Sequence, residues 1–301
     1  MEPIRNFTEL TDHLKSLDSK KRVAVICPDD EATQYAVDRA LRDGFATFIL
    51  IGDSEKYAGF INGCEAPELI ETIDVKQPVE AAKKAVELVR DGRADIIMKG
   101  IVNTDDLLRA ILNKETGIMP QGQLLTHITA AQIPDYHKLL FMADVAVIPY
   151  PTLDQRIKML RLDLDVIRRF GISRPKVALI HFTEKVNPKF PNSVDYQTIV
   201  EMADKGEFGD AIVAGPMDVK TACDRHSAEI KHIASPVCGD ADLVQFPNIE
   251  SANTFYKAIS FFGHADMAGT LLGPKAPVML PSRSDSGLSK YYSLCLTVLA
   301  V

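Results

Sequence analysis

Residues 22–52, RVAVICPDDEATQYAVDRALRDGFATFILIG, decide the fold class of this chain. The apolar run at 22–27 predicts a buried β-strand, and a second apolar run at 46–52 predicts another. Between them, the amphipathic segment 30–43 predicts a helix that Asp30 caps and Gly44 ends. A strand–helix–strand order with short connections implies parallel strands joined by a right-handed crossover, so we expect an α/β fold.

The same alternation continues along the chain. Strands are predicted at 95–98, 145–148, 176–180, 210–213, 242–244 and 277–280, with helices at 78–90, 152–170, 194–204, 251–262 and from about 286. Ligands of open parallel sheets bind beyond the carboxyl ends of strands, so the residues that follow strands are the candidate site. No GxGxxG or GxxxxGK[ST] motif follows a strand, which excludes a standard dinucleotide fingerprint and a P-loop.

Composition narrows the class of protein further. The chain has 301 residues, of which 46% are hydrophobic, and a net charge of −7, so two domains and no nucleic-acid partner are expected. No run approaches the roughly 18 apolar residues of a membrane helix, and the start lacks a secretory core, which favours a cytoplasmic protein. The five cysteines show no CxxC or Cys/His cluster, so we expect reduced thiols and no metal.

The most specific segment is 277–286, PVMLPSRSDS, where a strand runs into a helix. Free N–H groups at the helix start, the hydroxyls of Ser282 and Ser284, and the guanidinium of Arg283 together suit a phosphate group. Alternatively, Ser282-x-x-Asp285 is a capping box with a purely structural role.

Lys99, Gly100 and Thr104 form a second strand end, with Thr104 as a possible cap of a helix at 104–113 that carries Arg109. The structural alternative is a strand–turn–helix with solvated surface charges.

A third segment places Asn248 at a helix start, with Asn253 and Lys257 one turn apart on one face. An ordinary capped amphipathic helix would look the same. His127 is a candidate base or, alternatively, a structural histidine.

Taken in order, these segments resemble the phosphate acetyl/butyryltransferase family over nearly the whole chain. The motifs that carry the resemblance are Lys99-Gly100, Thr104, Leu108-Arg109, Leu125-Thr126-His127, Gly215-Pro216-Met217-Asp218, Pro247-Asn248-Ile249-Glu250, Asn253, Tyr256-Lys257, Gly273-Pro274-Lys275-Ala276-Pro277-Val278 and Ser282-Arg283. The resemblance implies two α/β/α domains with parallel-rich sheets flanking a cleft, as in isocitrate and isopropylmalate dehydrogenases. It places the domains at 1–127 plus 272–301 and at 128–271, and implies a homodimer or a higher homo-oligomer.

The function implied by the resemblance is reversible transfer of a short-chain acyl group between coenzyme A and inorganic phosphate. The motif Ser282-Arg283-x-Asp285-Ser286…Lys290 resembles the butyryltransferase branch more than the acetyltransferase branch. The implied catalytic residues are Ser282, Arg283 and Asp285. The implied substrate-binding residues are Lys99, Thr104, Arg109, His127, Asn248, Asn253, Lys257, Lys275 and Lys290. Asp285 is the first candidate for a base and His127 the second. Acyl-CoA and phosphate are then the small-molecule partners, with no tightly bound cofactor.

Two alternatives stay open at this point. The acetyl branch commonly carries an acidic residue seven positions after the motif serine, where this chain has Ser289. A non-catalytic protein that binds acyl-CoA or phosphate would fit that difference. An NAD-dependent dehydrogenase of the same fold superfamily is the other alternative.

Overall fold

The computed structural model describes residues 1–282 and 285–301. Contacts divide the chain into two compact units, and each has a discontinuous sequence. The middle unit comprises Met1–Phe7 and Thr126–Met267, and the terminal unit comprises Thr8–Leu125 and Ala268–Val301. Met1–Phe7 belongs to the middle unit because Ile4 is buried and its N–H donates to the Phe170 carbonyl at 2.8 Å. The division into folding domains that the sequence suggested stays a prediction.

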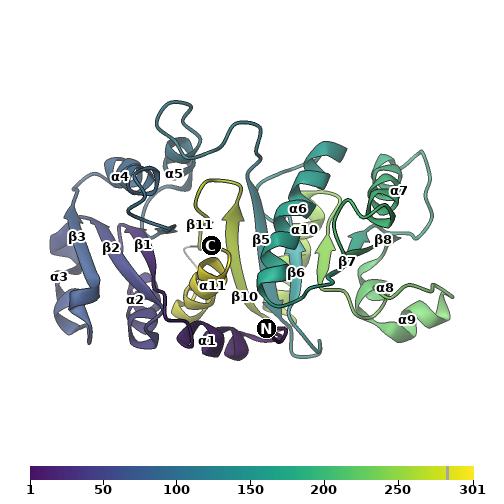
Figure 1. Ribbon diagram of the computed structural model, residues 1–301, viewed down its shortest axis with the longest axis horizontal. Coiled ribbons are helices and arrows are strands. Elements are labelled where there is room, and N and C mark those ends of the chain that lie inside the picture. The colour runs from purple at the N-terminus through teal and green to yellow at the C-terminus, as the bar shows by residue number, and fades with distance from the viewer. Residues whose placement is uncertain (283–284) are drawn as a thin grey trace. The chain divides into compact units, whose positions relative to one another are not determined.

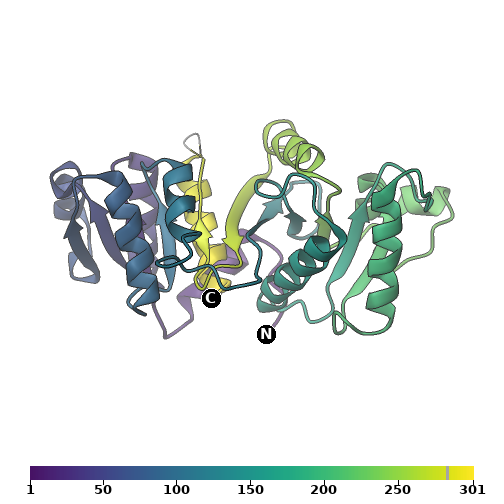
Figure 2. The same ribbon diagram turned by 90° about the horizontal axis from the view of Figure 1, so that it is seen from above.

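The strands of the terminal unit follow the order β3-β2-β1-β4-β11-β10. The first five are mutually parallel where they pair, and β10 runs antiparallel to β11. Helices lie on both sides of these strands (Figure 2), with α2 packed on α11 and α4 packed on α5 (Figure 1). The strands are β1 Lys21–Ile26, β2 Ala46–Gly52, β3 Ile70–Asp74, β4 Ile96–Lys99, β10 Asp266–Leu272 and β11 Val278–Met279. The helices are α1 Phe7–Lys15, α2 Glu31–Asp43, α3 Ser54–Gly63, η1 Pro67–Leu69, α4 Pro78–Arg90, α5 Thr104–Ile111 and α11 Gly287–Leu299.

The start of the terminal unit forms as its sequence predicts. The Asp30 side chain accepts the Thr33 N–H at 2.9 Å and so caps α2. Gly44 ends the helix in the left-handed region, at φ +78°, where a side chain is disfavoured. The buried face of α2 (Ala36, Val37, Ala40 and Leu41) recurs at helical spacing and packs on the sheet side. Local signals and tertiary burial therefore agree in this segment.

The strands of the middle unit follow the order β5-β6-β9-β7-β8. β5 is antiparallel to β6, and the other pairs are parallel. The strands are β5 Thr126–Gln132, β6 Leu140–Ala143, β7 Lys176–Ile180, β8 Ile212–Met217 and β9 Leu243–Gln245. The helices are α6 Leu153–Arg169, α7 Pro191–Asp204, α8 Val219–Cys223, α9 Arg225–Ile230 and α10 Ile249–Phe261. Its core contains apolar side chains from the central strands, including Met142, Ala178 and Val244, and Met217 from the edge strand β8.

The predicted parallel-rich α/β class is confirmed, but one predicted strand is wrong. Residues 145–148 form a bend, and the strand of this region is β6, which ends at Ala143. The reason is the Asp144 carboxylate, which accepts the N–H groups of Ala146 and Val147 at 2.8 Å each. Those amides are satisfied locally, so they are not available to a strand ladder.

In the part of the chain that the structure describes, no helix is both long and apolar enough to span a bilayer.

Candidate active site

Gly100 sets the close approach of two strand ends in the terminal unit. Its N–H donates to the Ile26 carbonyl at 2.8 Å, directly after the parallel pair β1 and β4. A Cβ at Gly100 would lie 2.2 Å from the Cys27 carbonyl oxygen, so only glycine fits. Lys99, the last residue of β4, is 4% exposed, and its Nζ lies 3.3 Å from the Gly100 carbonyl. The turn therefore holds a buried lysine at the carboxyl edge of the sheet.

Lys290 is a buried partner of the first strand–helix turn. Its Nζ lies 2.7 Å from Asp30 Oδ1 and 3.0 Å from Thr33 Oγ1, and the residue is 3% exposed. Burial raises the pKa of Asp30, but the hydrogen bonds from Lys290 and Thr33 outweigh it, so that pKa lies below its usual value. The sequence placed Lys290 among the substrate contacts and named Asp30 only as a helix cap. The contacts of Lys290 with Asp30 and Thr33 instead join α11 to the start of α2.

Two hydrogen bonds join Ser282 to Asp285 ahead of α11. The Ser282 N–H donates to Asp285 Oδ2 at 2.8 Å, and the Asp285 N–H donates to the Ser282 carbonyl at 3.2 Å. The capping-box interpretation is wrong, because Ser286 caps α11 by accepting the Ser289 N–H at 3.1 Å. Ser282 is exposed and precedes α11 in the sequence. Arg283 and Ser284 lie outside the described residues, so the predicted role of Arg283 stays a prediction.

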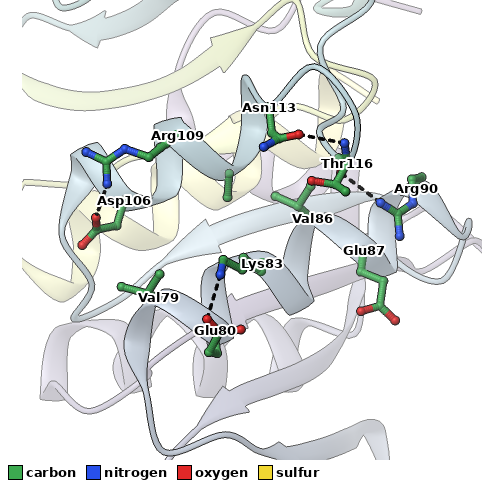
Figure 3. Close-up of a pocket in the computed structure, with 11 residues that line it drawn as sticks. Val79, Glu80, Lys83, Val86, Glu87, Arg90, Asp106, Arg109, Asn113 and Thr116 are labelled. Carbon is green, nitrogen blue, oxygen red and sulfur yellow. Dashed lines mark hydrogen bonds and ion pairs between the residues drawn. The ribbon is translucent and has the colours of Figure 1, made fainter.

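Arg109 lines a cavity of about 390 Å³ over α4 and α5 (Figure 3). Its Nη1 lies 2.9 Å from Asp106 Oδ1, and its side chain is 76% exposed. Lys83 and Arg90 also line the cavity, together with Glu80, Glu87 and Asp106, so the charges around it balance. Arg109 is therefore accessible on the surface, but its surroundings do not strongly attract an anion.

The structure also shows which residue caps α5 and what Lys275 contacts. Asn103, not Thr104, caps α5, because its Oδ1 accepts the Asp105 N–H at 3.1 Å. The idea that Thr104 is the cap is wrong, and Thr104 is the first helical residue. Lys275 has an exposed side chain, and its backbone N–H donates to the Ile118 carbonyl at 2.9 Å.

In the middle unit, the antiparallel pairing of β5 with β6 brings His127 to the carboxyl end of β6. Asp144 Oδ2 accepts the Thr126 hydroxyl at 3.0 Å and the His127 N–H at 3.3 Å. His127 Nδ1 lies 3.2 Å from Thr129 Oγ1. Burial lowers the pKa of His127 and outweighs the opposing charge of Asp144. The imidazole is therefore neutral at pH 7 and able to accept a proton.

The helix α10 is fixed to the same edge by two asparagines. Asn248 Oδ1 accepts the Ser251 N–H at 2.9 Å and caps α10. Asn253 Nδ2 donates to the Val145 carbonyl at 3.0 Å, which holds the helix against the bend after β6. Lys257, one turn on, lies with its Nζ 5.8 Å from the centre of the Tyr256 ring. The structure thus brings His127, Asn248 and Asn253 to one edge of one unit.

Arg156 is a positioning residue that sequence reasoning missed. It is 1% exposed and donates to the Pro247 carbonyl at 2.7 Å and to Asn192 Oδ1 at 2.8 Å. Arg156 therefore fixes the segment that leads from β9 to Asn248. No sequence signal would have identified it, because an arginine in an amphipathic helix usually lies on the surface. Among residues 1–282 and 285–301, no cluster of three His, Cys, Asp or Glu side chains is arranged to hold a metal.

Polar residues gathered at the carboxyl ends of parallel strands, together with two α/β units, are typical of α/β proteins that bind small ligands at strand ends. A family model described as phosphate acetyl/butaryl transferase matches residues 68–298. The chain is 36% identical over 298 residues to the phosphate butyryltransferase of Clostridium acetobutylicum, and the match covers 98% of each chain. The chain therefore belongs to the phosphate acetyl/butyryltransferase family, and it is an acyltransferase.

Solved structures agree with this assignment. A branched-chain phosphotransacylase from Enterococcus faecalis matches with a TM-score of 0.81 and 30% identity, covering 93% of this chain and 98% of that one. A 4-hydroxythreonine-4-phosphate dehydrogenase from Klebsiella pneumoniae has a TM-score of 0.53 and 11% identity, and covers 94% of this chain and 100% of that one. The second likeness shows the fold alone, and it confirms the dehydrogenase-like architecture expected from the sequence.

Proposed function

We propose that the enzyme transfers a butyryl or similar short-chain acyl group reversibly between coenzyme A and inorganic phosphate. The observation that carries the choice of butyryl is the near full-length likeness to the Clostridium acetobutylicum phosphate butyryltransferase. In one direction a phosphate oxygen attacks the thioester carbonyl, the C–S bond breaks, and coenzyme A leaves as a thiolate. In the other direction the thiol attacks the acyl phosphate and phosphate leaves.

The phosphate is proposed to bind at the turn before α11. The two hydrogen bonds with Asp285 fix the backbone of Ser282, which is an exposed residue. Arg283 follows directly in the sequence. Its fork of N–H donors matches phosphate oxygens and the negative charge that grows on the carbonyl oxygen.

The base that takes the proton from the coenzyme A thiol is proposed to be either Asp285 or His127. A thiol with its pKa near 8.5 is only slightly ionised at pH 7, so a neighbouring base increases the thiolate fraction. Asp285 Oδ2 already accepts the Ser282 N–H, whereas burial keeps the His127 imidazole neutral. The local chemistry therefore favours His127, although sequence reasoning ranked Asp285 first.

The remaining parts of the proposal concern binding and assembly. Lys99, Thr104, Arg109, Lys257 and Lys275 are proposed as contacts to acyl-CoA. The enzyme is proposed to act in the cytoplasm as a homodimer, with coenzyme A as a substrate and without a tightly bound cofactor. Sedimentation equilibrium checks the dimer.

The test is a panel of acetyl-, propionyl-, butyryl- and isobutyryl-CoA, with free thiol measured in the presence and absence of phosphate. We expect phosphate-dependent thiol release that is fastest with the four-carbon substrates. Thiol release from acetyl-CoA but not from butyryl-CoA would reject butyryl as the transferred group. Binding of acyl-CoA without any release would instead identify a non-catalytic acyl-CoA-binding protein.

A further inference from the structure

A second cavity lies at the opposite edge of the middle unit from His127 and Asn248. Its volume is about 630 Å³, and it is lined at the amino ends of β6, β7 and β9, three strands that run parallel. Lys138 precedes β6, Lys176 begins β7, and Asp242 precedes β9. His127 and Asn248 lie at the carboxyl ends of β6 and β9, so the cavity is a separate place.

Two carboxylates at this cavity are already neutralised by lysines. Lys138 Nζ lies 2.8 Å from Asp240 Oδ1 and 2.6 Å from Asp242 Oδ1, and Lys176 Nζ pairs with Asp240 Oδ2. The Lys176 N–H donates to Asp242 Oδ2 at 2.7 Å, and His137 Nε2 lies 2.8 Å from Asp240 Oδ1. Asp242 is buried, and Lys138 is nearly so. This network gives the cavity a fixed wall whose charges cancel.

Three arginines from distant parts of the sequence line the same cavity: Arg5, Arg174 and Arg225. In the described part of the chain, neither Arg174 nor Arg225 forms an ion pair with a carboxylate. The cavity therefore carries a surplus of positive charge in a protein whose net charge is −7. The exposed Arg174 and Arg225 line the cavity without carboxylate partners, and the planar fork of a guanidinium matches phosphate oxygens.

We propose that this cavity binds a small molecule that carries a diphosphate group. Its volume falls within the range of about 300–1,000 Å³ that is typical of small-ligand pockets. A single inorganic phosphate would fill only a small part of it, whereas two linked phosphates can reach more than one arginine. Because Asp240 and Asp242 are both paired with lysines, they do not favour binding of a cation in the cavity. This proposal does not depend on the acyl-transfer proposal, because it uses different residues at the other edge.

The experiment is titration calorimetry of the full chain with inorganic pyrophosphate, ADP and AMP. The test protein is the double variant Arg174→Ala/Arg225→Ala. The matched control is Arg161→Ala, which removes an exposed arginine of the same unit that lies 3.8 Å from Glu207. Circular dichroism and thermal unfolding establish that each variant is folded.

We expect pyrophosphate and ADP to bind the wild type, and the double variant to lose at least tenfold in affinity. The control should stay within twofold. Acyl-transfer rates measured without added pyrophosphate or ADP should be equal in all three proteins, which separates this result from a failure of the acyl-transfer site. No binding to the wild type, or equal binding to the double variant, would overturn the proposal. Equal affinity for AMP and ADP would overturn the diphosphate class.

Discussion

The ammonium group of Lys290 lies 2.7 Å from the carboxylate of Asp30, and so ties the last helix of the terminal unit to the N-cap of α2. The two residues are 260 positions apart in the sequence. Lys290 is almost completely buried, and Asp30 and Thr33 are the partners of its ammonium group. These contacts indicate that Lys290 stabilises the fold, and its contact with substrate stays a prediction.

Lys290→Met should therefore reduce the free energy of unfolding by about 3 kcal/mol, because it leaves Asp30 without its partner. The double variant Lys290→Met/Asp30→Asn should recover part of that loss. Urea denaturation measures the stability, and the KM for acyl-CoA should stay within twofold. A large rise in KM with unchanged stability would show instead that Lys290 contacts substrate.

The lowered pKa of Asp30 predicts how the stability of the fold responds to acid. Its pKa is lower in the folded protein than in the unfolded chain. Its contribution is therefore present above the unfolded pKa of about 3.9 and is lost as the pH falls through the folded value. Asp30→Asn should flatten the acid limb of a plot of unfolding free energy against pH. An unchanged acid limb would contradict the assigned pairing.

Asp163 is expected to have the opposite effect on stability. Its side chain is completely buried, and neither oxygen has a hydrogen-bond partner in the described residues. Burial, with a further contribution from Asp144, raises the pKa of Asp163 well above its usual value. The unfolded chain then releases this proton first, so stability falls as the pH rises above the unfolded pKa.

Asp163→Asn should stabilise the protein at pH 7 and have almost no effect near pH 3. The control is Asp165→Asn on the same helix, whose side chain is 73% exposed and which should change little at either pH. Denaturant midpoints at the two pH values give the answer. A loss of stability at pH 7 would mean that the ionised carboxylate is stabilised in the fold.

The two candidate bases are separated by pH–rate profiles. If His127 is the base, kcat/KM should fall as the pH drops through a pKa below 6.5, since burial lowers that value. His127→Gln should remove this limb and reduce kcat about a hundredfold. Asp285→Asn, measured in parallel, should keep the limb. The reverse pattern would assign the base to Asp285.

Arg283→Ala should reduce kcat at least about a hundredfold, which is the usual effect of removing one donor to a developing oxyanion. Arg283→Lys should restore only part of the activity, because an ammonium group lacks the planar fork. Arg93→Ala is the control, since that exposed arginine pairs with Glu71 at 2.6 Å. Activity near the wild-type level in Arg283→Ala would refute the proposed phosphate site.

Gly100 and Gly59 form a matched pair. Gly100→Ala places a Cβ 2.2 Å from a backbone oxygen, so it should destabilise the protein and disturb Lys99. Gly59 lies inside α3 with nothing within 4 Å of an added Cβ, so Gly59→Ala should stabilise the helix by about 0.5–1 kcal/mol. The thermal unfolding midpoints of the two variants measure both effects. A neutral Gly100→Ala would show that the strand ends separate easily.

The elements that the sequence predicted best are those whose signals are local. The helix 30–43 has its cap, its apolar face and its terminal glycine within one stretch, and α2 follows them closely. Residues 145–148 are apolar enough for a strand, but the Asp144 carboxylate binds their amides, and apolar periodicity does not reveal such a contact. The β-propensity of these residues is high, but the local hydrogen bonds to Asp144 prevent a strand.

The candidate site shows the same division. Lys99 and Asn248 could be found because Lys99 ends a strand and Asn248 follows one, whereas His127, near the start of β5, was singled out only as a histidine. Some of the partners that fix the fold around this site could not be found, because they come from remote parts of the sequence. Arg156 reaches Pro247 across 91 positions, and Asp30 meets Lys290 across 260. Only the packed units bring these groups within hydrogen-bonding distance.

The position of β11 has a consequence for synthesis in the cell. This strand, Val278–Met279, pairs with β4 on one side and with β10 on the other. Until the ribosome has made it, one edge of β4 has no partner, and an open strand edge favours association with other nascent chains. The terminal unit must therefore complete its sheet late, after the whole middle unit has been translated. Overexpressed protein should depend on chaperones during that interval.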